Sequence, residues 1–194
     1  MLNKKETQEV LHHLYITYGE TGTALKYQTP FQLLISTMLA AQSTDTRVNI
    51  VTKYLFKRYP KPADFIKLST QELENEIKSI GLYKSKAKNI LATCRYLLDH
   101  YDGRLPESRE ALMQLPGVGR KTANVVLSIT TDFPAIAVDT HVFRVSNRIG
   151  LANADNVLET EKQLMKIIPE EQWSAAHHWL IWHGRKICKA RKPI

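Results

Sequence analysis

The sequence predicts an all-α fold, and three observations support this prediction. Apolar residues recur at the three- and four-residue spacing of amphipathic helices along most of the chain. Helix start signals precede these periodic segments. The only strand-like stretch, residues 135–138, is too short for a sheet without partners, so we expect an extended crossover there.

The first strong helix signal is Thr29 followed by Pro30, a pair typical of an N-cap and a first-turn proline. Residues 31–35 are apolar on most helix faces, which predicts a helix at the centre of a helical domain. The same periodicity predicts further helices over residues 45–59, 108–115, 120–130, 140–149, 156–168 and 172–187.

Two more helices are expected in the middle of the chain. Ser69 and Glu72 form a capping-box pair before a short helix, which Gly81 can close in the left-handed conformation. Segment 85–100 carries its apolar residues on one helix face and lysines on the other. Cys94 falls on the apolar face, so we expect it in the core.

Size and charge limit the possible functions. The chain has 194 residues, of which 43% are hydrophobic, enough for the core of one domain or of two small domains. Its 27 Lys and Arg exceed its 19 Asp and Glu, and the net charge of +8 favours a polyanionic partner such as nucleic acid. Charge alone does not identify that partner.

Cysteine content and the N-terminus bear on the compartment. Cys94 and Cys188 are the only cysteines, too few for the disulfide framework of a secreted module. The first residues lack the apolar core of a signal peptide, and no apolar run approaches the roughly 20 residues that span a bilayer. We therefore expect a soluble, cytoplasmic, nucleoid-associated monomer with no membrane association.

The sharpest local motif is residues 115–123, a tight hairpin between two predicted helices. Gly117 and Gly119 permit positive φ and a close approach of the backbone to another chain. The amide groups that begin the second helix can bind an anion such as a phosphate, independently of base identity. The alternative is an ordinary turn between packed helices.

These segments resemble a known family. Residues 115–123 resemble the helix-hairpin-helix of the DNA glycosylase superfamily, and residues 138–142 resemble its catalytic aspartate segment. Residues 41–45, 80–87 and 177–185 are similar to segments of endonuclease III. On these motifs, the chain is identified as a member of the endonuclease III family over nearly its whole length.

The resemblance implies two helical domains with a DNA-binding cleft between them. Residues 23–134 would form a six-helix barrel domain that contains the hairpin, and residues 1–22 and 135–194 a terminal-helix domain. It also implies a base-excision repair enzyme acting on double-stranded DNA. This enzyme would be a bifunctional DNA N-glycosylase and AP lyase that removes oxidised pyrimidines and cleaves abasic sites.

Lys121 is the nucleophile that the resemblance implies, because relatives without an amine at this position generally remove bases without cutting the strand. The amine would attack the sugar C1′ and form a Schiff base that permits elimination of the 3′ phosphate. Only a neutral amine can attack. We expect Arg120 and partial burial to favour the neutral form, whereas bound phosphates favour the ammonium.

Asp139 is the catalytic carboxylate by the same resemblance. It would stabilise positive charge on the sugar when the base leaves, and could relay a proton to or from the amine. Its position directly after the extended stretch also suits a helix N-cap, worth about 1 kcal/mol. The two roles can coexist.

The resemblance also assigns DNA contacts. The damaged nucleotide must leave the stack, and Gln42 and Leu82 would fill the hole it leaves. Asp45 would belong to the lesion pocket. The remaining DNA-binding residues implied are Gly117, Gly119, Arg120 and His141.

Members of the endonuclease III family usually carry a 4Fe-4S cluster with four cysteine ligands. Cys188 resembles the first of these ligands, but the second would follow Ile194, so the chain as printed has one of the four. Either a longer chain supplies the others, which we favour, or the protein has no cluster. His177, His178 and His183 more plausibly cap, pack or contact phosphate than bind zinc.

Two alternatives to the bifunctional enzyme stay open. The chain could be a monofunctional glycosylase, or a helix-hairpin-helix module that binds DNA without chemistry. Covalent trapping through Lys121 discriminates among the three.

Overall fold

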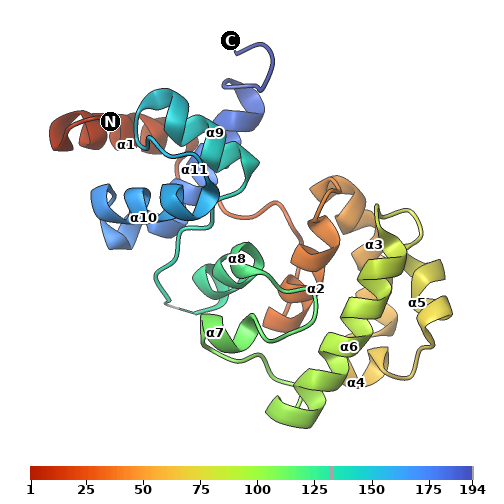
Figure 1. The fold of residues 1–194 in the computed structure, drawn as a ribbon. Helices are drawn as coiled ribbons and strands as arrows, with labels where there is room; N and C mark the ends of the chain where they lie inside the picture. Colours follow the sequence, from red (N-terminus) through yellow and green to blue (C-terminus); the bar gives the residue numbers. More distant parts are fainter. Residues whose placement is uncertain (132, 194) are drawn as a thin grey trace. The chain divides into compact units, whose positions relative to one another are not determined.

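The computed structural model describes residues 1–131 and 133–193, and in these residues it contains helices and no strand (Figure 1). The all-α prediction is confirmed. Asp132 and Ile194, which fall within the expected domain ranges, lie outside the described residues. The chain divides into two compact units, one of Met1–Thr23 with Asp132–Ile194 and one of Ala24–Thr131.

The Ala24–Thr131 unit is built around an apolar helix. Its helices are α2 (Pro30–Ala40), α3 (Asp45–Arg58), α4 (Pro62–Phe65), α5 (Thr70–Ile77), α6 (Tyr83–Tyr101), α7 (Arg109–Leu112) and α8 (Arg120–Thr130). Helix α2 packs against α3, α6 and α8. Leu33, Leu34 and Ile35 are fully buried, which confirms the predicted central helix.

Local signals start two helices of this unit, α2 and α5, as predicted. The Thr29 hydroxyl accepts a hydrogen bond from the Gln32 amide, and Pro30 occupies the first turn of α2. Ser69 and Glu72 form the capping box of α5. Cys94 lies in the core as expected, and burial raises the pKa of its thiol to about 12.

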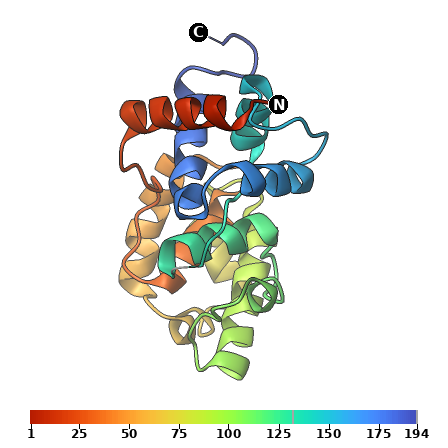
Figure 2. The same ribbon diagram turned by 90° about the vertical axis from the view of Figure 1, so that its left-hand side faces the viewer.

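The other unit joins both ends of the chain. It contains α1 (Lys4–Tyr18), α9 (Thr140–Ile149), α10 (Val157–Ile167), the 3-10 turn η1 (Glu170–Gln172) and α11 (Trp173–Lys186). Helix α11 packs against α1 and α9, and Figure 2 shows the red α1 beside the blue α11. Residues 135–138 are buried and form neither helix nor strand, as expected for a crossover.

Two local predictions were wrong in detail. Gly81 does not adopt positive φ; Leu82 does, with φ of 58°. Gly81 instead lies at a close approach, because an added Cβ would be 3.3 Å from the Gln42 carbonyl oxygen. The helix expected over 108–115 is shorter in the structure. Helix α7 ends at Leu112, and backbone hydrogen bonds between residues three apart continue up to Leu115.

Candidate functional site

The hairpin of residues 115–119 is a closed turn held from α6. The Val118 amide donates to the Leu115 carbonyl at 3.0 Å, and Gly117 between them has φ of 79°. A Cβ on Gly117 would also lie 2.8 Å from Asn89 Nδ2. Glycine is therefore required here for both conformation and space.

A second contact from α6 fixes the same turn. The buried Thr93 hydroxyl donates to the Pro116 carbonyl at 2.9 Å. Sequence reasoning missed both Asn89 and Thr93. Their spacing of four residues puts them on one face of α6, and this spacing was the available signal.

Gly119 plays a different part from Gly117. Its φ is −92°, so the positive φ that glycine permits is used at Gly117 and not at Gly119. Gly119 is the N-cap of α8 and has no side chain to accept a hydrogen bond from the first-turn amides. The start of α8 thus keeps the donor groups and positive dipole end that suit an anion.

Lys121 is the second residue of α8, one position after Arg120. Its side chain is exposed, so the expected partial burial is wrong. Among residues 1–131 and 133–193, no hydrogen bond or ion pair holds its amine. The amine is therefore available to a bound substrate.

Asp139 begins α9 in the other unit as its N-cap, as predicted. Its Oδ1 accepts hydrogen bonds from the amides of His141 and Val142, both at 2.8 Å. The buried His177 ring donates through Nδ1 to the Ala137 carbonyl at 2.7 Å, just before this carboxylate. This support from α11 was not predicted from the sequence.

Gln42 and Leu82 share an uncommon geometry. Both are exposed and both have positive φ, 54° and 58°. Non-glycine residues adopt this left-handed conformation rarely, and then often for a functional reason. The two turns are joined, because the Gly81 amide donates to the Ser43 hydroxyl at 3.3 Å.

The two remaining predicted contacts lie in different units. Asp45 is the first residue of α3, after the N-cap Thr44. His141, in the first turn of α9, has its Nδ1 3.1 Å from an Arg144 guanidinium nitrogen. A Cβ on Gly184 would be 2.9 Å from this ring nitrogen, so α11 packs closely against it.

Cys188 is buried just after α11, with its sulfur 3.6 Å from an Arg148 guanidinium nitrogen. Cys94 belongs to the other unit. Within the described part of the chain, no group of three or more His, Cys, Asp or Glu could hold a metal ion. A single thiol does not fit a four-cysteine cluster.

His177, His178 and His183 each have a polar contact within the protein. Besides the bond of His177 to the crossover, His178 Nδ1 donates to the Ser174 carbonyl at 2.8 Å. His183 Nδ1 lies 3.1 Å from the Tyr18 hydroxyl. Burial lowers the pKa of His178 and of His183.

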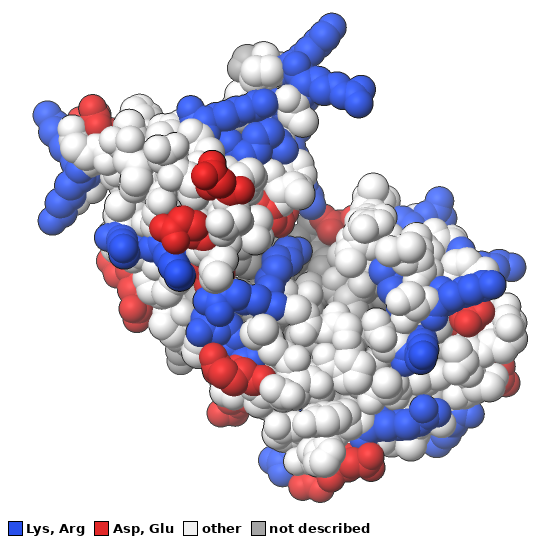
Figure 3. Space-filling model, in the orientation of Figure 1, with Lys and Arg blue, Asp and Glu red and all other residues white. Residues whose placement is uncertain are grey.

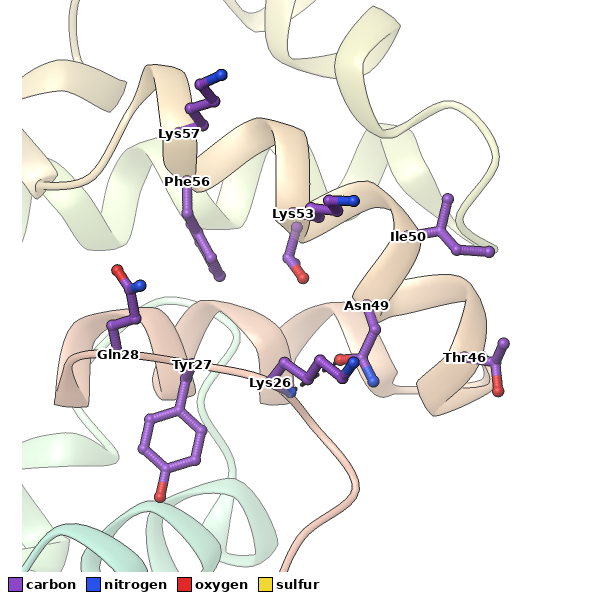
Figure 4. Close-up of a pocket in the computed structure, with 10 residues that line it drawn as sticks. Lys26, Tyr27, Gln28, Thr46, Asn49, Ile50, Lys53, Phe56 and Lys57 are labelled. Atoms are coloured by element: carbon purple, nitrogen blue, oxygen red, sulfur yellow. Dashed lines mark hydrogen bonds between the residues drawn. The ribbon is translucent and has the colours of Figure 1, made fainter.

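Basic side chains are distributed over both units, and several project from the C-terminal segment at the top of Figure 3. The Ala24–Thr131 unit also has a pocket of about 740 Å³, lined by Lys26, Lys53 and Lys57 and by no carboxylate (Figure 4). Lys53 and Lys57 come from α3, and Lys26 from the segment before α2. None of the predicted site residues lines this pocket.

In the described residues, no helix has the length and apolar character needed to cross a membrane.

Comparison with known proteins gives matches over the whole chain. Residues 35–170 match the family model of the HhH-GPD superfamily base excision DNA repair protein. Endonuclease III of Bacillus subtilis (strain 168) is 47% identical over 194 residues, covering 100% of this chain and 89% of the relative. Endonuclease III of Escherichia coli (strain K12) is 48% identical over 192 residues, covering 99% and 91%.

Solved structures agree with these matches. A trapped endonuclease III–DNA covalent intermediate and a non-covalent endonuclease III–DNA complex each give a TM-score of 0.96 at 51% identity, covering 100% of this chain and 91% of theirs. A thermostable thymine-DNA glycosylase, 23% identical, shares the fold with a TM-score of 0.85.

The helical fold, the hairpin and the family match define the class: a helix-hairpin-helix base excision DNA repair protein. Within that class, the full-length relatives show that the chain belongs to the endonuclease III family.

Proposed function

We propose that Lys121 is the amine through which this chain excises damaged pyrimidines and cuts the strand. As a member of the endonuclease III family, the chain is a bifunctional DNA glycosylase and AP lyase. The observation that carries the assignment is an exposed lysine with an uncommitted amine at the uncapped start of α8, directly after the hairpin. A relative of this chain has been captured as a covalent DNA intermediate.

In the proposed reaction, the neutral Lys121 Nζ attacks C1′ of the target nucleotide. The bond from C1′ to the base breaks, and the base leaves with the bonding electrons and takes up a proton. Opening of the sugar ring gives a Schiff base between C1′ and Nζ. A base then removes a C2′ proton, the 3′ phosphate leaves, and water hydrolyses the Schiff base to release the lysine.

Asp139 stabilises the positive charge that develops on the sugar as the base departs. Both backbone bonds go to Oδ1, and among the described residues Oδ2 has no hydrogen bond partner. One oxygen thus fixes the carboxylate while the other is available to the sugar or to a proton.

In the same proposal Gln42 and Leu82 occupy the space left by the extruded nucleotide. Gln42 offers hydrogen bonds to the orphaned base, and Leu82, 59% exposed, offers an apolar wedge. Asp45 and His141 contact the lesion or its sugar. Gly117, Gly119 and Arg120 bind phosphates.

The proposal assigns the Ala24–Thr131 unit to the six-helix domain of the family and the other unit to the terminal-helix domain. Lys121 and Asp139 belong to different units, so the reaction requires both units to act on the same nucleotide. The proposed substrates are oxidised pyrimidines and abasic sites in duplex DNA, bound by one copy of the chain.

Borohydride trapping tests the proposal. With a duplex that carries an abasic site or an oxidised pyrimidine, the wild-type protein should form a covalent complex, and Lys121→Gln should form none. Lys166→Gln, a change of an exposed lysine on α10, should trap as well as the wild type. Base excision without trapping in the wild type would establish a monofunctional glycosylase, and binding without either activity a non-catalytic module.

A further inference from the structure

Lys86 is a buried cation that the proposed chemistry does not use. It lies in the first turn of α6 and is 7% exposed. No carboxylate pairs with it among the described residues, and burial lowers the pKa of its ammonium. Lysine is almost never buried without a specific set of partners, because removing its charge from water is costly.

Three oxygen atoms surround the Lys86 ammonium. Nζ donates to the carbonyl of Leu39 at 2.9 Å, to the carbonyl of Ala41 at 2.6 Å, and to the hydroxyl of Ser43 at 3.4 Å. An ammonium has three protons to donate, so this set satisfies it completely. The Ala41 and Ser43 acceptors lie on the turn that follows α2 and contains Gln42, and the Leu39 carbonyl belongs to the last turn of α2.

Lys86 is also bonded to the turn of Leu82. Its backbone amide donates to the Leu82 carbonyl at 3.1 Å. Ser43, which accepts from the ammonium, accepts from the Gly81 amide as well. One lysine thus connects the turn of Gln42 with the turn of Leu82.

Both connected turns carry a residue whose backbone is in the left-handed conformation. Residues other than glycine adopt this conformation rarely, and the surrounding structure must then hold them in it. The two side chains must enter the DNA stack as a pair to replace one nucleotide. A tether that holds both turns would supply the required alignment before DNA binds.

We propose that Lys86 is a positioning residue that holds the Gln42 and Leu82 turns in register for insertion into the duplex. This inference rests on the proposed function, in which these two residues fill the vacated space. Lys86 does not touch the substrate. Loss of the Lys86 ammonium should therefore affect only those substrates in which a nucleotide must be extruded from a duplex.

The test compares one variant on two substrates under single-turnover conditions. Lys86→Met, of similar size and without charge, should lower cleavage of an abasic site in duplex DNA by about tenfold to a hundredfold. It should leave cleavage of an abasic site in single-stranded DNA within about twofold of the wild type, because no stack has to be entered. Lys88→Met, an exposed lysine on the same helix, should behave as the wild type on both substrates.

A fluorescence measurement separates insertion from chemistry. With 2-aminopurine opposite a tetrahydrofuran abasic analogue, the wild type and Lys88→Met should change the fluorescence as the opposite base is displaced, and Lys86→Met should give a reduced change. Ser43→Ala, which removes the bridge to Gly81 and the longest of the three bonds to Lys86, should give a smaller loss in the same direction. This variant keeps the test valid if Lys86→Met does not fold.

The inference is overturned if Lys86→Met loses activity equally on both substrates, or if neither it nor Ser43→Ala affects the duplex substrate or the fluorescence. Failure of the proposed function is distinguishable, since the wild type would then cleave neither substrate.

Discussion

Two lysines of one unit show how environment separates residues of the same type. Lys86 is buried and each of its ammonium protons has an acceptor, whereas Lys121 is exposed and its amine has no partner among the described residues. A satisfied ammonium stabilises local structure, and an uncommitted amine can react. The sequence indicated Lys121 through its motif. Lys86 was expected among the lysines on the polar face of segment 85–100, and this was wrong, because its burial depends on the path of a distant turn.

The capping role and the chemical role of the Asp139 carboxylate should be separable by substitution. Asp139→Asn keeps an oxygen that can cap α9, so the thermal midpoint should change little, while base excision should fall by about a hundredfold or more. Asp139→Ala removes the cap as well and should cost about 1 kcal/mol of stability in addition. Thermal denaturation and single-turnover excision measure the two effects. Equal loss of stability in both variants would contradict the separation.

Helix α6 organises three turns of the proposed DNA-contacting surface. Leu82 precedes it, Lys86 holds the turn of Gln42, Asn89 lies against Gly117, and Thr93 bonds to the hairpin. Positions 86, 89 and 93 are spaced by three and four residues, so they share one helix face. The helix thus links features that lie more than 70 residues apart in the chain.

Most helices were predictable here, although α1 and the short α4 were not among those expected, and turn geometry was not predictable. Thr29, Ser69 and Asp139 cap the helices that the sequence predicted, because capping depends on residues within one turn. The left-handed residue before α6 is Leu82 and not Gly81, because tertiary contacts fix this turn. Local propensity carries no information about such contacts.

The hairpin glycines should differ in their tolerance of a methyl group. Gly117→Ala meets Asn89 and requires positive φ, so it should lower stability by about 1–3 kcal/mol and weaken duplex binding. Gly119→Ala has ordinary φ and meets nothing within 4 Å, so it should cost less than about 1 kcal/mol. Equal destabilisation in chemical denaturation would refute this account of the turn.

At the scale of the whole molecule, the proposed chemistry is divided between two units. Lys121 lies in the central unit, whereas Asp139 lies in the unit assembled from both chain ends. The fold class and this assembly from both termini followed from helix periodicity and the family motifs. The hydrogen bonds that position the active groups, such as the bond of His177 to the Ala137 carbonyl, were visible only in the structure.

Stability of the whole chain should fall in mild acid through His178. Burial depresses its pKa from 6.5, so the unfolded chain takes up a proton that the folded chain resists. The stabilisation that comes from burying a neutral His178 ring is present above about pH 6.5, and it is lost as the pH falls towards the pKa of the ring in the folded chain. In His178→Gln the thermal midpoint should fall less between about pH 7.5 and pH 5.5 than in the wild type. An unchanged pH dependence would contradict the assignment.

The measurement that bears most directly on the central claim is the site of covalent attachment. Borohydride reduction of the wild-type protein on an abasic duplex, followed by nuclease and protease digestion, leaves a sugar remnant that mass spectrometry can locate. We predict that the remnant is attached to Nζ of Lys121 and to no other lysine. A remnant on another lysine or on the N-terminal amine, or its absence from a protein that still cuts the strand, would contradict the account.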